Sequence, residues 1–187
     1  MNLKLSLGVA AAAIVASAFA FKSVESGLKI GESVSPFHPT FVAGPLAGKD
    51  ACFPCTYKSR PQVQVWVNGE SEENLVKIAK SLQQNVESHK GKEFQAMIVY
   101  VGPSKDCMAC AGKMQAVAEK SGAKDVSFAV VGKKDEAVAA YKINLDSSVK
   151  NTVIAYKDWK VVKAATNVKG DEAGCEAICD MVAKIAK

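Results

Sequence analysis

The sequence predicts a single α/β domain with a mostly parallel central sheet, an antiparallel hairpin near its C-terminal end and helices on both faces. Three observations predict this class. Segments with the period of strands alternate with segments of helical period between residues 61 and 187. The strand segment at 96–101 is continuously apolar, as is typical of a strand buried on both faces in a parallel sheet. The last two strand segments follow each other too closely for a helix to join them.

The N-terminal residues 1–20 are typical of a signal peptide. Lys4 precedes an apolar run rich in Leu, Val and Ala, and alanines at 18 and 20 suit a signal peptidase. Because the run is shorter than the roughly 20 residues that span a bilayer, we favour cleavage before Phe21 over a membrane anchor. We therefore expect a periplasmic or secreted protein with no membrane contact after cleavage.

Residues 21–60 are expected to form an extended lead-in to the domain at 61–187, because prolines and glycines interrupt it. The domain then opens with a strand at 63–67 that buries one face. Ser71 caps the helix that follows, and acidic residues occupy its first turn, where the helix dipole favours them. The buried stripe of this helix is expected to comprise Leu75, Ile78, Ala79, Leu82 and Val86.

The second half of the chain continues the alternation. We expect a buried strand at 96–101, a helix that contains Cys110 and ends near Gly122, a strand at 126–131 and a short helix at 135–141. Strands at 152–156 and 159–165 form the hairpin. The last helix is expected to begin at a cap on Asp171 and to bury Cys175, Ile178, Cys179, Val182 and Ile185.

Several stretches resemble the thioredoxin and peroxiredoxin-like (redoxin) superfamily. Residues 31–37 resemble the Gly-x-x-x-x-Pro-x-Phe lead-in of the redoxin branch, and residues 140–143 with the hairpin after them resemble the closing elements of both branches. Cys52-Phe53-Pro54-Cys55, between Gly44-Pro45 and Arg60-Pro61, resembles exported bacterial thioredoxin-like proteins. The resemblance covers the chain from about residue 28 and implies a thioredoxin-like fold.

The sequence departs from that superfamily at two places. Typical members have a Cys-x-x-Cys between a central strand and the next helix, where this chain reads Asn68-Gly69-Glu70-Ser71. They also have a cis-proline before the strand that is expected here at 152–156, where this chain has Asn151. A cis bond before a non-proline residue costs about 2.5–4 kcal/mol, so we expect a trans bond. In an alignment shifted to plain thioredoxin, residues 107–110 fall near the expected position.

All six cysteines follow the predicted cleavage point, in three closely spaced pairs. Cys107 and Cys110 have the clearest chemical case, because a helix start stabilises a thiolate through unpaired N–H groups and the dipole. Lys105 and Lys113 act in the same direction, and Asp106 opposes them. A structural disulfide is the alternative, and both remain open.

The other two pairs have different contexts. Cys52 and Cys55 have the redox spacing, with Pro54 to stiffen the ring, but the sequence shows no helix start there, so a redox pair and a structural disulfide again remain open. Cys175 and Cys179 lie one turn apart on an apolar stripe and are expected to be buried thiols, because free cysteine is among the most buried residue types. A disulfide between them within the helix is geometrically poor, whereas a disulfide to another pair remains an alternative.

The leading hypothesis is a thiol–disulfide oxidoreductase-like protein outside the cytoplasm. A thiolate of Cys107 or Cys52 would attack a disulfide of a protein or small-molecule partner, and Cys110 or Cys55 would resolve the mixed disulfide. The rival is a non-catalytic thioredoxin-like binding module with structural disulfides. A metal-binding protein is a third hypothesis, disfavoured by the long separation of the two Cys-x-x-Cys pairs.

We expect no cofactor, no metal and no nucleic-acid partner. No His follows either Cys-x-x-Cys, so the usual c-type haem motif is absent. The net charge of +5 comes from lysines interleaved with acidic residues rather than from one basic cluster.

Overall fold

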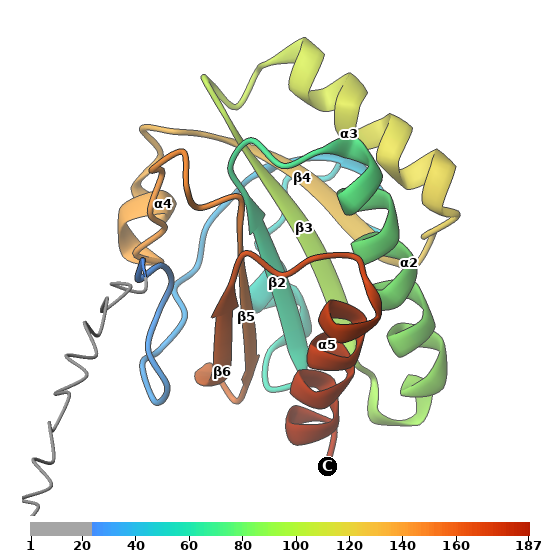
Figure 1. Ribbon diagram of the computed structural model, residues 1–187. Helices are drawn as coiled ribbons and strands as arrows, with labels where there is room; N and C mark the ends of the chain where they lie inside the picture. The colour runs from blue at the N-terminus through green and yellow to red at the C-terminus, as the bar shows by residue number, and fades with distance from the viewer. Residues whose placement is uncertain (1–23) are drawn as a thin grey trace, which may run out of the picture.

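The computed structural model describes residues 24–187, so the predicted signal peptide and its cleavage before Phe21 lie outside the described residues. The described chain forms one mixed six-stranded sheet with helices on both faces (Figure 1). The sheet order is β1 (Thr40–Ala43), β4 (Val126–Gly132), β3 (Gln95–Gly102), β2 (Gln62–Val67), β5 (Asn151–Lys157) and β6 (Lys160–Thr166).

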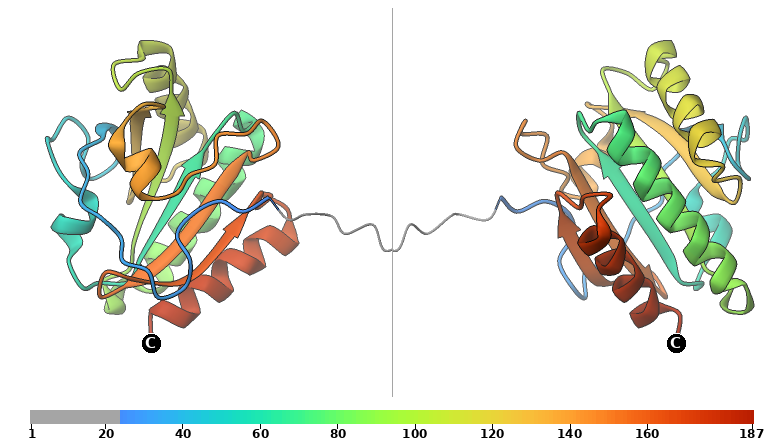
Figure 2. Two further views of the ribbon diagram at one scale, coloured as in Figure 1. Left: turned by 90° about the vertical axis from the view of Figure 1, so that its left-hand side faces the viewer. Right: turned by 45° about the vertical axis from the view of Figure 1, so that its right-hand side comes forward.

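The three central strands β2, β3 and β4 are parallel, and the strands around them are antiparallel to their neighbours. The long helices α2 (Glu72–Ser88), α3 (Met108–Ser121) and α5 (Glu172–Ile185) cover one face, side by side in Figure 2, right. The short helices α1 (Phe53–Tyr57) and α4 (Glu136–Ala140) and the chain before β1 cover the other face (Figure 2, left). A 3₁₀ turn at Lys90–Lys92 precedes β3.

From β2 to α5 the element order agrees with the sequence prediction. Ser71 and Asp171 cap α2 and α5 through their side chains, and Gly122 ends α3 in the left-handed conformation. The predicted stripe of α2 is buried in full. Helix propensity, caps and apolar period therefore act together in these elements.

The prediction that β2 buries only one face is wrong. Every residue of β2 is buried, including Gln62 and Gln64, because β3 and β5 pair with it on both sides and both sheet faces are covered. The glutamines are satisfied internally: Gln64 Nε2 donates to the Tyr156 hydroxyl at 2.7 Å, which donates to Gln62 Oε1 at 2.8 Å. Trp66 Nε1 donates to Gln64 Oε1 at 3.0 Å.

The lead-in at 21–60 has more structure than its prolines and glycines indicate. Rather than forming an irregular stretch, it contains β1, which pairs with β4, and α1, which has Pro54 in its first turn. Residues 31–34 also bond to the edge of β6, where Gly31 N donates to the Val161 carbonyl at 2.8 Å. Short elements of this kind depend on tertiary pairing, which local sequence does not display.

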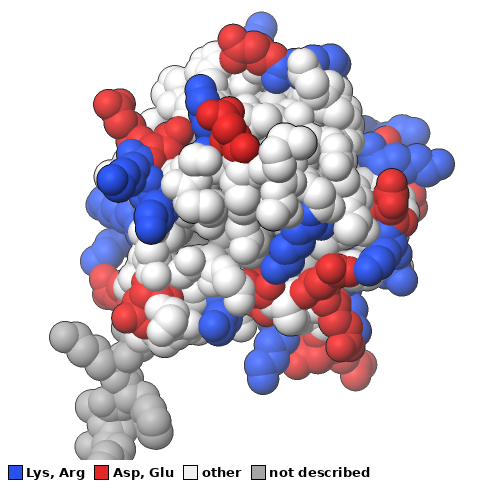
Figure 3. Space-filling model, turned by 90° about the horizontal axis from the view of Figure 1, so that it is seen from above, with Lys and Arg blue, Asp and Glu red and all other residues white. Residues whose placement is uncertain are grey.

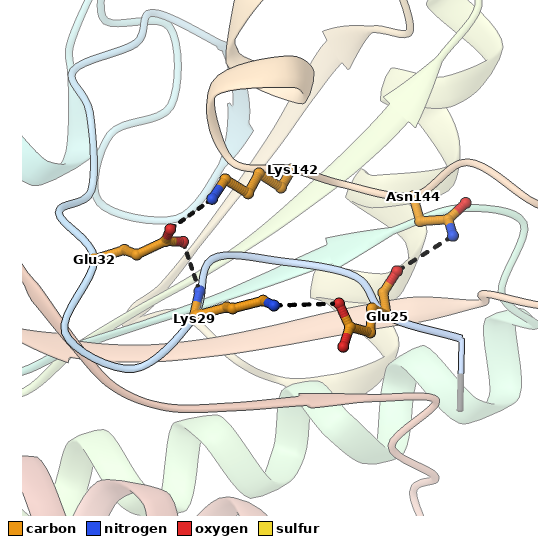
Figure 4. A network of polar contacts seen from close by, with 5 residues as sticks. All are labelled: Glu25, Lys29, Glu32, Lys142 and Asn144. Atoms are coloured by element: carbon orange, nitrogen blue, oxygen red, sulfur yellow. Dashed lines mark hydrogen bonds and ion pairs between the residues drawn. The ribbon is translucent and has the colours of Figure 1, made fainter. Parts of the chain in front are cut away.

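A polar network fastens the earliest described residues to the loop after α4 (Figure 4). Glu32 accepts from the Lys29 backbone N–H and from the Lys142 ammonium, and the Glu25 carbonyl accepts from the Asn144 side chain. The segment therefore packs as part of the domain. Within residues 24–187, no helix is both long and apolar enough to cross a bilayer.

Gly44 provides a test of how tightly β1 and β4 approach. Its φ is +80°, and a Cβ there would overlap the Val126 carbonyl oxygen. Gly48 has a φ of +69°, and a Cβ added there would have no other atom within 4 Å. We expect Gly48→Ala to lower the free energy of unfolding by about 1–2 kcal/mol, from the backbone conformation alone, and Gly44→Ala by a further ~1–3 kcal/mol. Urea unfolding of both variants checks this, and equal losses would contradict it.

Candidate functional site

The disulfide between Cys107 and Cys110 lies at the start of α3, just beyond the end of β3. Cys107 is the N-cap of this 14-residue helix, and its sulfur accepts a hydrogen bond from the Cys110 N–H at 3.2 Å. The same N–H and the positive end of the helix dipole are available to a Cys107 thiolate after reduction. The sequence prediction of a helix start at this pair is therefore confirmed.

The two sulfurs of this pair differ in access. Cys107 is half-buried, whereas Cys110 is only 8% exposed and packs in the core beneath α3. Met108, between them, is 85% exposed. A nucleophile from outside can therefore approach Cys107, while Cys110 is screened by the protein.

Glycines at the ends of two strands make room for this disulfide. A Cβ on Gly102 would lie 2.8 Å from Cys110 Sγ, and one on Gly132 would lie 3.2 Å from the Ser104 Cα. The Lys133 N–H donates to the Gly102 carbonyl at 2.8 Å, which joins the ends of β4 and β3. The loop at 103–107 consequently lies directly against the carboxyl edge of the parallel strands.

The charges expected to favour the Cys107 thiolate are only partly directed at it. Lys113 donates to the Glu70 carbonyl at 2.9 Å and lies 5.2 Å from the centre of the Tyr100 ring, so its ammonium is held toward the start of α2. Lys105 and Asp106 are both exposed. The helix terminus is thus the main local source of thiolate stabilisation.

The loop after β2 occupies the same edge of the sheet and contains no cysteine, as the sequence alignment indicated. Pairing of β2 with β3 and β5 places β2 among the central strands of the sheet. In place of a dithiol, Glu70 Oε2 accepts from Asn151 Nδ2 at 2.8 Å, and Asn151 Oδ1 accepts from the Val168 N–H at 2.9 Å. Asn74 Oδ1 accepts from the Gly170 N–H. None of the described peptide bonds is cis, so Asn151 is trans as expected.

Sequence reasoning missed the roles of Glu70 and Asn74. The sequence feature that could have indicated these roles was the cluster of polar residues between a buried strand and a helix cap, because such residues need partners where strand ends converge.

At the start of α2, a hydrogen bond from Lys120 lowers the pKa of Glu72 below its ordinary value. Figure 3, seen from above this edge, shows a broad uncharged area with basic and acidic side chains interleaved around it.

Cys52 and Cys55 form a second disulfide, at the start of α1. The sequence showed no helix start there; Cys52 is in fact the N-cap, and Pro54 in the first turn was the usable signal. Access is reversed relative to the first pair, because Cys52 is buried and Cys55 exposed. The helix has only five residues, so its dipole is small. Burial raises the pKa of the neighbouring Tyr57.

Cys175 and Cys179 are free thiols, and the prediction that they are buried is wrong. Cys175 is half-buried and Cys179 is exposed. The buried stripe of α5 consists instead of Ile178, Met181, Val182 and Ile185. The cysteines lie at the border of that stripe, where Asn85 of α2 donates to Cys179 Sγ at 3.4 Å.

The structure thus keeps the three pairs apart. Each of the first two forms a disulfide within itself, on opposite faces of the sheet, and α2 separates α3 from α5 (Figure 2, right). Within residues 24–187 no three His, Cys, Asp or Glu side chains gather as a group that could hold a metal ion.

Neither a protein-family model nor a curated protein matches the sequence. Solved structures do match the fold. One, from Chlorobium tepidum, is provisionally named thiol:disulfide interchange protein DsbE; it is 14% identical, with a TM-score of 0.63 over 86% of this chain and 99% of that one. The thioredoxin domain of a thiol-disulfide oxidoreductase from Bacteroides vulgatus is 13% identical, with a TM-score of 0.59 over 83% and 99%.

A peroxidoxin, BcpB from Mycobacterium tuberculosis, is also similar, at 14% identity and a TM-score of 0.59 over 84% of this chain and 98% of that one. Matches at this level of identity establish the fold. The chain therefore has a thioredoxin-like fold, with a mixed sheet and helices on both faces, as the resemblance in the sequence implied.

The packing of Gly102 against Cys110 can be tested with a glycine on the same helix as its control. Gly112 has no atom within 4 Å of an added Cβ, so Gly112→Ala should stabilise α3 by about 0.5–1 kcal/mol. Gly102→Ala should instead destabilise the oxidised protein by about 1–3 kcal/mol, because the disulfide has to shift. Denaturant unfolding without reductant measures both effects. An unchanged free energy of unfolding for Gly102→Ala would show that the disulfide does not pack tightly against β3.

Proposed function

We propose that this chain, with its thioredoxin-like fold, carries out thiol–disulfide exchange through Cys107 and Cys110. The observation that carries the proposal is the accessible Cys107 at the N-cap of α3 with Cys110 buried behind it. An accessible, dipole-stabilised sulfur suits attack on or by a partner, and a screened neighbour suits resolution within the protein.

The exchange balances in either direction. With the pair reduced, the Cys107 thiolate attacks a partner disulfide, one partner sulfur leaves as thiolate, and a mixed disulfide forms. The Cys110 thiolate then attacks Cys107 Sγ, which restores the disulfide and releases the partner with both sulfurs reduced. With the pair oxidised, a partner thiolate attacks Cys107 Sγ, Cys110 leaves as thiolate, and a mixed disulfide forms. A second partner thiolate then attacks the partner sulfur of that mixed disulfide and Cys107 leaves as thiolate, so the partner is released with a disulfide and the pair is reduced.

We place this activity outside the cytoplasm, in the periplasm or the secreted state. The support is the sequence of residues 1–20, which has the composition of a cleaved signal peptide, and the cysteine pairs in the remainder of the chain. The names of two similar structures, a thiol:disulfide interchange protein and a thiol-disulfide oxidoreductase, agree with proteins or small thiols as the partners.

A second candidate is a binding module whose disulfides are structural. The observation that favours it is the loop after β2, which contains no cysteine. There Asn151 bonds to Glu70 and to the backbone of Val168, and Asn74 bonds to the backbone of residues 168 and 170. Asn151 is 1% exposed, so this network is part of the fold. The two candidates differ in the redox behaviour of Cys107 and Cys110.

Mixed-disulfide trapping tests the proposed roles of the two sulfurs. In a Cys175→Ser/Cys179→Ser background, a reduced Cys110→Ser variant should stop at an adduct of Cys107 with one glutathione when treated with glutathione disulfide. With Cys110 intact, the protein should release the glutathione and close its own disulfide, because the resolving sulfur is adjacent. Mass spectrometry of digested, alkylated protein locates the adduct.

The matched control is Cys55→Ser in the same background, which leaves the buried Cys52 as the sulfur to be trapped. We expect its adduct to form at least about tenfold more slowly than that of Cys107, because thiolate character and access govern the rate. An adduct at Cys107 that appears only on unfolding would overturn the catalytic role.

Redox titration separates the two candidates. Under thiol–disulfide exchange, the Cys107–Cys110 pair should equilibrate with dithiothreitol buffers at a potential well above about −300 mV while the fold persists. A structural disulfide should lie below that value. Alkylation at each buffer poise, with circular dichroism on the same samples, gives both quantities; resistance of both disulfides up to unfolding would favour the binding module.

A further inference from the structure

We propose that Cys175 and Cys179 form a two-sulfur site on α5 for a soft monovalent cation, of which Cu(I) is the biological example. The site is separate from both disulfides and does not depend on the thiol–disulfide activity proposed above. It rests on the spacing of the two thiols, their access, and a buried amide directed at one of them.

The spacing suits a shared ion better than a disulfide. Residues four apart on a helix lie on one face with Cβ atoms about 5–6 Å apart, whereas a disulfide needs about 3.5–4.5 Å. A metal–sulfur bond is about 2.3 Å, so two sulfurs on opposite sides of one ion are about 4.6 Å apart. Thiols that extend from these Cβ atoms reach that separation without leaving the helix.

Both thiols are accessible, in contrast to the buried stripe that the sequence predicted. Cys179 is exposed and Cys175 half-buried, beside a stripe filled by Ile178 and Val182. An ion can therefore be delivered to them and removed without opening the core. The two Cys-x-x-Cys pairs are oxidised, so these are the free thiols of the described chain.

A buried donor on the neighbouring helix points at the Cys179 sulfur. The Asn85 side chain is 4% exposed; its amide donates to Cys179 Sγ at 3.4 Å and to the Ser81 carbonyl at 2.8 Å. The second bond fixes the direction of the amide, so the first is aimed at the sulfur. The Cys179 sulfur therefore has a fixed polar neighbour on α2, which limits where it can lie beside Cys175.

The donor set selects the class of ion. Within residues 24–187 no third His, Cys, Asp or Glu joins these two thiols as a possible ligand, so a four-coordinate structural zinc site is not available. Thiolates are soft ligands that prefer Cu(I) among biological ions. Binding is balanced as one Cu⁺ exchanged for two thiol protons, with two Cu–S bonds formed and no change in oxidation state.

The test is a competition for Cu(I) between the protein and bicinchoninate, without oxygen and with ascorbate, which leaves both disulfides oxidised. The protein is used with its disulfides formed and residues 175 and 179 reduced. We expect it to withdraw one Cu(I) per chain from the chelator, and we expect bound Cu(I) to protect both free thiols from alkylation. Cys175→Ser and Cys179→Ser should each lower the affinity at least about a hundredfold, because one sulfur cannot chelate.

A displaced pair provides the matched control. Cys179→Ser combined with Asp180→Cys keeps two thiols on α5 but places them five residues apart, on different faces of the helix. It should lose the tight site while its circular dichroism and its exchange at Cys107 stay unchanged. Three results would each overturn the proposal: copper retained by the chelator, equal binding by the displaced pair, or one copper per two chains.

Discussion

The rest of the structure depends on the burial of β2, which is paired with a strand on each side and covered on both faces of the sheet. Gln62 and Gln64 lie in that strand without solvent, and the Tyr156 hydroxyl of the adjacent β5 bonds to both. Each of these polar groups, left without a partner, would cost about 1–3 kcal/mol. Because Tyr156 lies directly opposite Gln62 in the β2–β5 ladder, the hydrogen bonds also fix the register of the hairpin against the parallel strands.

With β2 fixed, the parallel strands end at one edge and α2, α3 and α5 all begin there. The fold therefore repeats one local environment, a strand end followed by a helix start, in successive β-α units. After β2 that environment holds the Glu70 and Asn151 network; after β3 it holds the disulfide of Cys107. A dithiol placed after β3 instead of after β2 still lies at a helix terminus and at the accessible edge of the sheet, although different loops surround the sulfur.

The features predicted well from sequence were those that local physics specifies. Ser71, Asp171 and Gly122 mark helix ends through their own hydrogen bonds or φ, and apolar runs mark β3 and β4. What failed depended on partners distant in sequence. The second buried face of β2 was not predicted, because Tyr156, the partner of Gln64, is 92 residues away. The predicted buried stripe of α5 wrongly included Cys175 and Cys179 and missed Met181, because the way α5 packs on the rest of the domain decides which side chains are covered.

The cysteine pairs differ in oxidation because of where each lies on its helix. Cys52 and Cys107 are N-caps with extended backbone, ψ 116° and 96°, which brings their Cα atoms to 5.2 Å from the partner three residues on. Cys175 and Cys179 both lie within α5, where helical geometry holds the Cβ atoms too far apart for a bond. A cysteine at a helix cap can close a disulfide with the first turn, whereas cysteines inside a helix remain thiols. The same residue type therefore forms a disulfide at the sheet edge and a pair of free thiols at the border of α5 beside α2.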